Sequence, residues 1–117
     1  MRVRRGDIVS VDLGGPSDNG TRGGEIYKTR PAVVIQNDVG NKHSVTTTIA
    51  PISGGHTNYP FHVNLPGSMD EFNKDSHVQL DQIRTVDIEE RVVDKHGTVS
   101  PSQMDEIEDA IRISLKL

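Results

Sequence analysis

The amino-acid sequence predicts a mainly β protein, a small antiparallel barrel or curled sheet that ends in an α-helix. Three observations lead to this prediction. Short apolar stretches follow one another closely, clusters of Gly, Asn and Pro separate them, and a helix start signal stands near the end of the chain. A chain of 117 residues fits one domain, which we assign to residues 1–117.

The first expected strand, Ile8–Leu13, places Val9, Val11 and Leu13 on one face, and this period of two indicates a half-buried strand. The next segment, Gly14–Gly24, contains five glycines and almost nothing apolar, so a long loop is expected there. It lacks the Lys-Ser/Thr pair that completes a phosphate-cradling motif. No nucleotide cofactor, and no other cofactor, is therefore expected.

Further strands are expected wherever β-branched and apolar residues gather between turn residues. They lie at Arg30–Gln36, Ser44–Ile52, Phe61–Leu65, Val78–Asp81, Arg84–Asp87 and Arg91–Lys95. Asn37–Asn41 is rich in turn-forming residues, so we expect it to be the turn of a hairpin that joins the first two. Runs this short and this closely spaced are typical of a small antiparallel sheet or barrel.

The C-terminal segment carries the signals of a helix start. Ser100 suits the N-cap, Pro101 the first helical position, and Gln103 completes a capping box. Apolar residues then recur at helical spacing on one face, which is expected to pack on the sheet. These residues are Met104, Ile107, Ile111 and Leu115.

Composition sets limits on function. Hydrophobic residues make up 32% and aromatic residues 3% of the chain, which is lean for a globular domain and favours a homodimer. The net charge of −4 argues against coating of nucleic acid by bulk charge, although the first 30 residues carry a small basic excess. Without a membrane-length apolar run or a signal peptide, the chain is expected to be cytoplasmic and not membrane-bound.

Several kinds of chemistry find no support in the sequence. The chain has no cysteine, and its five histidines show no metal-ligand spacing, so no metal site is expected. We expect each histidine to be exposed to solvent. No serine stands in a nucleophile-elbow motif, so acyl transfer has no support either.

Arg30 is the most promising functional residue. Pro31 stiffens the backbone beside it, and a positioned guanidinium suits a carboxylate or phosphate. If Arg30–Gln36 and Ser44–Ile52 pair as a hairpin, Arg30 and Ser53 lie at the same end of it. With Glu25 and Asp81 nearby, this set indicates a phosphodiester site that needs no metal. A surface arginine at the start of a strand is the alternative.

In several stretches the chain resembles the MazF/PemK/Kid family of toxins from toxin–antitoxin systems. These are Arg5-Gly6-Asp7-Ile8-Val9, Arg30-Pro31-Ala32-Val33-Val34-Ile35-Gln36-Asn37-Asp38 and Asp81-Gln82-Ile83-Arg84-Thr85-Val86-Asp87. The resemblance implies an SH3-like barrel that forms a homodimer and cuts single-stranded RNA at specific short sequences without metal. It also implies inhibition by a cognate antitoxin. In such enzymes the ribose 2′-hydroxyl attacks the adjacent phosphate and leaves a 2′,3′-cyclic phosphate and a 5′-hydroxyl.

The resemblance also assigns site residues. The family's key arginine falls on Arg30 and its partner threonine on Ser53, a departure that keeps the hydroxyl but loses the methyl group. Asp81 and Glu25 match carboxylates of the family, and which of them accepts the proton stays open. The residues expected to bind RNA are Lys28, Gly54 and Gln82. One branch also has a histidine before the glutamate and a second arginine, where this chain has Gly24 and Gln79.

Two rival functions share the same expected fold. The chain could act like the CcdB toxins, which trap DNA gyrase and cut nothing, or it could be a noncatalytic nucleic-acid-binding SH3-like module. Fold alone does not separate these functions from cleavage. The discriminating feature is the pair Arg30 and Ser53, which a gyrase trap does not need.

Overall fold

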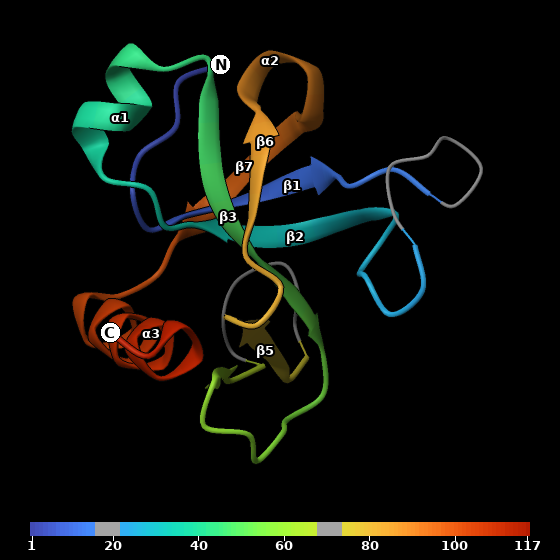
Figure 1. Cartoon of the computed structure of the whole chain (residues 1–117), viewed down its shortest axis with the longest axis vertical. Coiled ribbons are helices and arrows are strands. Elements are labelled where there is room, and N and C mark those ends of the chain that lie inside the picture. Colours follow the sequence, from blue (N-terminus) through green and yellow to red (C-terminus); the bar gives the residue numbers. More distant parts are fainter. Residues whose placement is uncertain (16–21, 68–73) are drawn as a thin grey trace.

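The computed structural model describes residues 1–15, 22–67 and 74–117. Most of the predicted loop Gly14–Gly24 lies outside the described residues. The strands are β1 (Asp7–Asp12), β2 (Thr29–Val34), β3 (Thr46–Gly54), β4 (His62–Leu65), β5 (Ser76–Gln79), β6 (Arg84–Asp87) and β7 (Val92–Thr98). The helices are α1 (Asp38–His43), α2 (Ile88–Arg91) and α3 (Pro101–Leu115), and Figure 1 shows their arrangement.

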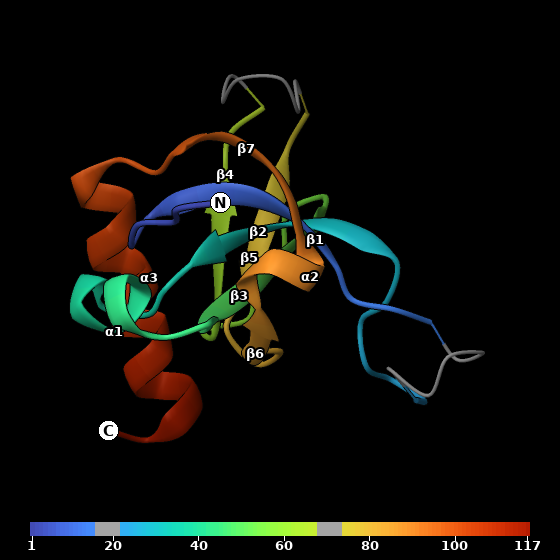
Figure 2. The same cartoon turned by 90° about the horizontal axis from the view of Figure 1, so that it is seen from above.

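The strands form one antiparallel sheet in the order β4-β5-β3-β2-β1-β7, with β6 paired to β3 beside this path. The predicted fold class, mainly β with a C-terminal helix, is therefore confirmed. The closed barrel is not confirmed, because among the described residues the terminal strands β4 and β7 do not pair with each other. Instead, α3 lies against the sheet near β4, and the sheet curls without closing (Figures 1 and 2).

Two apolar clusters occupy the two faces of the sheet. The first contains Ile8 and Val33 together with Ile107 and Ala110 of α3, and the second contains Val9, Val11, Leu13, Ala32, Val34 and Ile49. Because neighbouring strand residues point to opposite faces, β1 is buried on both sides at its start. The prediction of a half-buried first strand is wrong for Ile8, which α3 and its neighbours cover.

The connection between β2 and β3 differs from the prediction. Residues Asn37–Asn41 were expected to form a tight turn, but Asn37 is the N-cap of the short helix α1, where its side chain accepts a hydrogen bond from the Gly40 amide. Asn, Asp and Gly are common both in turns and at helix starts, which is why the pattern misleads. The predicted antiparallel pairing of the two strands is correct.

The predicted start of the C-terminal helix is confirmed. Ser100 and Gln103 form the capping box, and Pro101 stands at the first turn. Ile107 is buried, whereas Leu115, predicted for the same packed face, is 54% exposed because the helix runs past the sheet at its end. No helix in the described part of the chain is long and apolar enough to cross a membrane.

Two hydrogen bonds hold the carboxylate of Asp38 in α1. The Arg5 amide donates a hydrogen bond to its carboxylate at 2.7 Å, and the Asn41 amide a second at 3.2 Å. The Arg5 bond, helped by Asn41, lowers the pKa of Asp38 from its ordinary value of 3.8. A lowered carboxylate pKa stabilises the fold above pH 3.8, and this contribution is lost as the pH falls through the folded-state value.

Asp38→Asn should therefore lower the free energy of unfolding at pH 7 and have a smaller effect at acidic pH. Urea unfolding of both proteins at pH 7 and near pH 3 measures this difference. An equal loss at both values would contradict the assigned role of the ionised carboxylate.

Candidate functional site

The register of β2 and β3 brings Arg30 and Ser53 together. Ala32 pairs with Pro51, so Arg30 and Ser53, each two residues beyond that pair, come side by side at the end of the ladder. Both line one small pocket of about 90 Å³. Its lining consists of Arg30, Pro31, Ile52, Ser53, Gly54, Lys74 and Ser76. Lys74 and Ser76 were not predicted as site residues, because only the pairing of β5 with β3 brings them here.

The Arg30 side chain is held at its base. Its Nε donates a hydrogen bond to the Tyr27 carbonyl at 3.0 Å, and its backbone pairs with Val11 of β1. Within the described residues no carboxylate forms an ion pair with it, so pairing with Glu25 does not occupy the guanidinium. A guanidinium fixed in this way and left without a carboxylate is suited to an anion.

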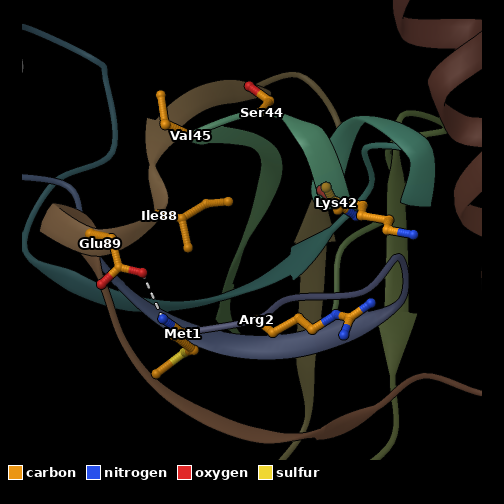
Figure 3. Close-up of a pocket in the computed structure, with 8 residues that line it drawn as sticks. Met1, Arg2, Lys42, Ser44, Val45, Ile88 and Glu89 are labelled. Carbon is orange, nitrogen blue, oxygen red and sulfur yellow. Dashed lines mark hydrogen bonds and ion pairs between the residues drawn. The ribbon is translucent and has the colours of Figure 1, made fainter.

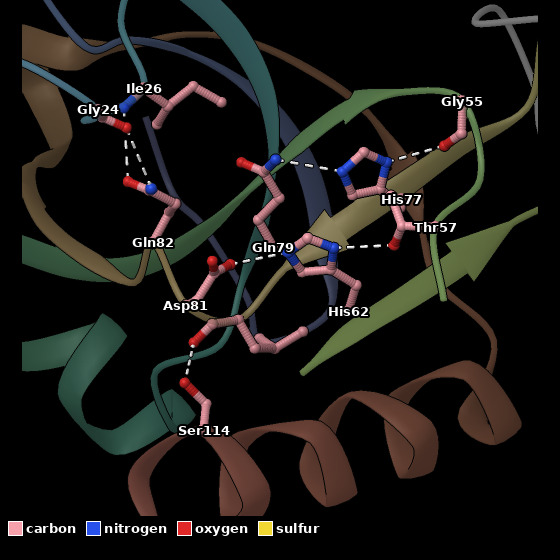
Figure 4. Close-up of polar contacts among 11 residues, drawn as sticks. Gly24, Ile26, Gly55, Thr57, His62, His77, Gln79, Asp81, Gln82 and Ser114 are labelled. Atoms are coloured by element: carbon pink, nitrogen blue, oxygen red, sulfur yellow. Dashed lines mark hydrogen bonds and ion pairs between the residues drawn. The ribbon is translucent and has the colours of Figure 1, made fainter. Parts of the chain in front are cut away.

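The two predicted carboxylates lie in a different pocket from Arg30 and Ser53. Glu25 and Asp81 line a depression of about 350 Å³ with Ile26, Gln82, Ile83 and Arg84. Here Gln82 contacts the backbone on both sides of Glu25, through Gly24 and Ile26, over long hydrogen bonds of 3.4 Å (Figure 4). The structure therefore divides the predicted catalytic residues between two depressions that share no lining residue.

Asp81 has a partner that the sequence did not reveal. The Nε2 atom of His62 lies 2.9 Å from the Asp81 carboxylate, and its Nδ1 lies 2.8 Å from the Thr57 hydroxyl (Figure 4). Only 7% of the His62 side chain is exposed, against 39% for Asp81. The His62 ring also stacks on the His77 ring, with centroids 4.8 Å apart, and His77 is itself buried.

The prediction of exposed histidines is therefore wrong for His62 and His77 and correct for His43 and His56. His96 is half-buried, and its ring is hydrogen-bonded to Ser10. Histidine is polar, so an exposed position is the ordinary expectation. Burial follows here because strands far apart in the sequence supply each ring with partners.

These side chains belong to one polar band on the sheet. Ser53 pairs with His77, His77 with Asn64, and Gln79 with His62. Paired residues project to the same face, so the five side chains lie on the face opposite to Val63, Val78 and Ile52. The Gln79 amide also contacts the His77 ring at 3.1 Å. We call Ser53, His77, Asn64, Gln79 and His62 the polar band, and it runs from the Arg30 pocket toward Asp81.

Of the remaining predicted residues, Gly54 lines the Arg30 pocket, and Lys28 stands two residues before Arg30 in the chain without lining that pocket. Lys28 has a positive φ of 74°, which is uncommon for a residue with a side chain, and its ammonium lies 5.4 Å from the Tyr27 ring centre. Gly54 lines the pocket, and a Cβ atom built on it meets no other atom within 4 Å. The space beside Gly54 is thus open to a ligand.

A further depression lies away from these two. It holds about 440 Å³ and is lined by Met1, Arg2, Asn41, Lys42, Ser44, Val45, Ile88 and Glu89 (Figure 3). Ser44 and Val45 precede β3, whereas Ser53 stands near its other end, so the two sites lie roughly 25 Å apart along the strand. The N-terminal ammonium binds Glu89 at 2.7 Å there. None of the predicted site residues reaches this depression.

The described residues contain no group of three His, Asp or Glu side chains placed to hold a metal ion. The site is thus built from a guanidinium, a hydroxyl and carboxylates on the open face of a curled antiparallel sheet. The molecule is thus a small β protein whose guanidinium and hydroxyl suit an anionic ligand that presents a phosphate or carboxylate.

Comparison with known proteins shows the family. The profile of the PemK-like, MazF-like toxins of type II toxin-antitoxin systems matches residues 4–115, and the chain belongs to this family. The endoribonuclease MazF of Staphylococcus epidermidis is 40% identical over 117 residues, which cover 98% of this chain and 92% of that protein.

Solved structures show the same fold. MazF from Deinococcus radiodurans superposes with a TM-score of 0.82 at 20% identity, covering 100% of this chain and 99% of that one. An endoribonuclease from a mycobacterial species, solved in complex with its cognate antitoxin, gives 0.78 at 24% identity, covering 98% and 96%.

The contacts of His62 predict that this ring stabilises the fold. His62→Ala removes a buried ring and its hydrogen bonds to Asp81 and Thr57, so the free energy of unfolding should fall by about 2–4 kcal/mol. His43→Ala, at an exposed position in α1, is the control and should change it by less than about 0.5 kcal/mol. Urea unfolding measures both, and equal stability of the two variants would contradict the burial of His62.

Proposed function

We propose that this protein is a sequence-specific endoribonuclease toxin that cuts single-stranded RNA, mRNA above all, without a metal ion and is inhibited by a cognate antitoxin. Membership of the family and the 40% identical endoribonuclease support the reaction class. The observation that carries the proposal is that Arg30 and Ser53 line one pocket on the open polar face. The cytoplasm, where mRNA is found, is the proposed location.

The proposed reaction uses a nucleophile that belongs to the RNA. The ribose 2′-oxygen loses its proton and forms a bond to the adjacent phosphorus, while the bond from phosphorus to the 5′-oxygen breaks. The departing 5′-oxygen takes up a proton, and a 2′,3′-cyclic phosphate remains. Atoms and charge balance without a protein nucleophile. Arg30 stabilises the extra negative charge of the phosphorane, and the Ser53 hydroxyl donates a hydrogen bond to a phosphate oxygen.

We assign the proton acceptor to Asp81 rather than Glu25. The His62 side chain, which is only 7% exposed, holds one oxygen of Asp81 at 2.9 Å, so this carboxylate is kept in one place while 39% of its side chain stays exposed. Glu25 stands on an exposed segment, which is held by the two 3.4 Å contacts of Gln82 and by a hydrogen bond from the Glu25 amide to the Arg22 carbonyl at 3.1 Å, none of which involves the Glu25 carboxylate. A fixed base reaches its proton at a smaller entropic cost than a mobile one.

RNA and protein partners follow from the same face. Lys28, Gly54 and Gln82 are the proposed RNA contacts, with Gly54 leaving room for the strand. An antitoxin that covers this face would block cleavage by excluding RNA. A homodimer is proposed because the end of α3 and the residue Leu117 beyond it expose apolar side chains: Ile113, Leu115 and Leu117 are 55%, 54% and 82% accessible in the single chain.

The first test changes Arg30. Arg30→Ala should lower cleavage of a mixed-sequence RNA by a factor on the order of a hundred or more, because a preorganised charge-stabilising donor is lost, while RNA binding weakens only modestly. Single-turnover cleavage rates and mapped RNA ends measure the effect. Arg112→Ala, which removes an exposed arginine of α3, is the matched control and should cleave like the unchanged protein.

Three further arms complete this test. Ser53→Ala should lose activity, whereas Ser53→Thr should keep it or raise it, because threonine restricts the rotamer of the hydroxyl. Excess EDTA should leave the rate unchanged. Loss of cleavage in EDTA would contradict the metal-free reaction, and unchanged turnover in Arg30→Ala would return this arginine to an ordinary surface role.

A second test separates the two carboxylates. Asp81→Asn should lower the cleavage rate by roughly 10²–10⁴, the usual contribution of a general base, and Glu25→Gln by less than about tenfold. Both variants keep the shape of the side chain, and the measurement is the single-turnover rate across pH. The reverse order of the two losses would assign the base to Glu25.

A further inference from the structure

Two aromatic side chains stand at one end of the polar band. The rings of Tyr59 and Phe61 stack with centroids 5.2 Å apart and planes 17° from parallel. Tyr59 is 60% exposed, whereas Phe61 behind it is half-buried. The chain contains only two tyrosines and two phenylalanines, and the Tyr59 ring adds little to the core. An exposed ring that is supported from behind is therefore a candidate contact for a ligand.

The aromatic pair is continuous with the proposed catalytic site. The His62 ring lies nearly perpendicular to the rings of Tyr59 and Phe61, with centroids 5.4 and 4.9 Å away, and it stacks on the His77 ring at 4.8 Å. His77 in turn pairs with Ser53 across the sheet. Ring contacts thus lead from Tyr59 to His77, and strand pairing places Ser53 of the Arg30 pocket beside His77. From the sheet spacing, Ser53 and His62 are roughly 12 Å apart.

We propose that Tyr59 is a stacking platform for one nucleobase of the single-stranded RNA whose scissile phosphate binds at Arg30 and Ser53. This inference rests on the function proposed above. Every base has a flat π face, so an exposed ring binds single strands with little sequence preference. Phe61 holds the platform in place from behind, and tyrosine loses little conformational entropy on binding because only two side-chain torsions must be fixed.

The charges at the Arg30 pocket favour RNA over a protein ligand. The Arg30 pocket contains two cations, Arg30 and the exposed Lys74, and suits a phosphate. A ligand that binds both at the Arg30 pocket and on the Tyr59 ring needs an anionic group and, more than about 12 Å from it, a flat aromatic group. An RNA strand has this combination at a separation of a few nucleotides, within the site size of about 4–16 nucleotides usual for small single-strand-binding folds.

The lack of tryptophan in this chain allows a direct test. In Tyr59→Trp the emission of the single indole reports contact at this position. The probe is the RNA sequence that the unchanged protein cuts, made with 2′-deoxynucleotides so that it carries no nucleophile. Its addition should quench the emission. Val93→Trp on β7, where the native side chain is also 60% exposed, is the control and should show no change.

Binding of the same probe gives the second measurement. Tyr59→Ala should raise the dissociation constant by roughly 5- to 150-fold, and Tyr59→Phe, which keeps the ring, by less than about twofold. In a series of strands that each lack one base at a different position, one strand should bind the unchanged protein more weakly than the intact strand does. The same strand should bind Tyr59→Ala as tightly as the intact strand does. That pattern identifies the stacked base.

The outcomes separate the two proposals. Intact RNA binding in Tyr59→Ala, with no quenching of the indole in Tyr59→Trp, would overturn the platform and leave the nuclease function standing. Loss of antitoxin binding alone in Tyr59→Ala would also overturn it and assign the ring to the protein partner. If the unchanged protein neither cuts nor binds any RNA, the proposed function fails and the platform fails with it.

Discussion

The pairing of β3 with three other strands is the constraint on which the rest of the structure depends. Residues 46–49 pair with β6, residues 49–51 with β2, and residues 52–54 with β5. One strand therefore helps to form the apolar core at Ile49 and the candidate site at Ser53. A shift of register by one residue would turn Ser53 to the opposite face. The position of Ser53 beside Arg30 thus follows from the packing of the core and not from contacts within the site.

Hydrogen bonds among the residues of the polar band, and to nearby residues, compensate for the hydration that its buried polar groups lose. The two ring nitrogens of His77 are hydrogen-bonded to the Gly55 carbonyl and to the Gln79 amide. Those of His62 are hydrogen-bonded to the Thr57 hydroxyl and to the Asp81 carboxylate. Buried polar groups that are satisfied in this way make a rigid surface. The Ser114 hydroxyl of α3 also donates to the Leu80 carbonyl at 2.8 Å, so the C-terminal helix fixes the segment that carries Asp81.

The sequence was sufficient for those features that depend on local pattern. The capping box of Ser100 and Gln103 was predictable from its local motif. The antiparallel pairing that brings Arg30 beside Ser53 was predictable because consecutive strands usually pair with each other. The helix α1 was missed because Asn37 suits a turn as well as an N-cap. The burial of His62 was missed because its partners lie on other segments. The alternation of polar and apolar residues in His62-Val63-Asn64-Leu65 and His77-Val78-Gln79-Leu80 places the polar side chains on one face of each strand, but it does not show that other segments cover them.

The division of the site into two depressions is consistent with the geometry of the proposed reaction. In an in-line displacement the attacking and leaving oxygens stand on opposite sides of the phosphorus. A proton acceptor for the 2′-oxygen and a group that stabilises the phosphorane near the 5′-oxygen therefore suit different sides of one phosphate. The Arg30 pocket, of about 90 Å³, is too small to hold a whole nucleotide together with a base. In the proposed reaction Asp81, which the polar band links to Ser53, acts on the 2′-oxygen, while Arg30 and Ser53 act on the phosphate.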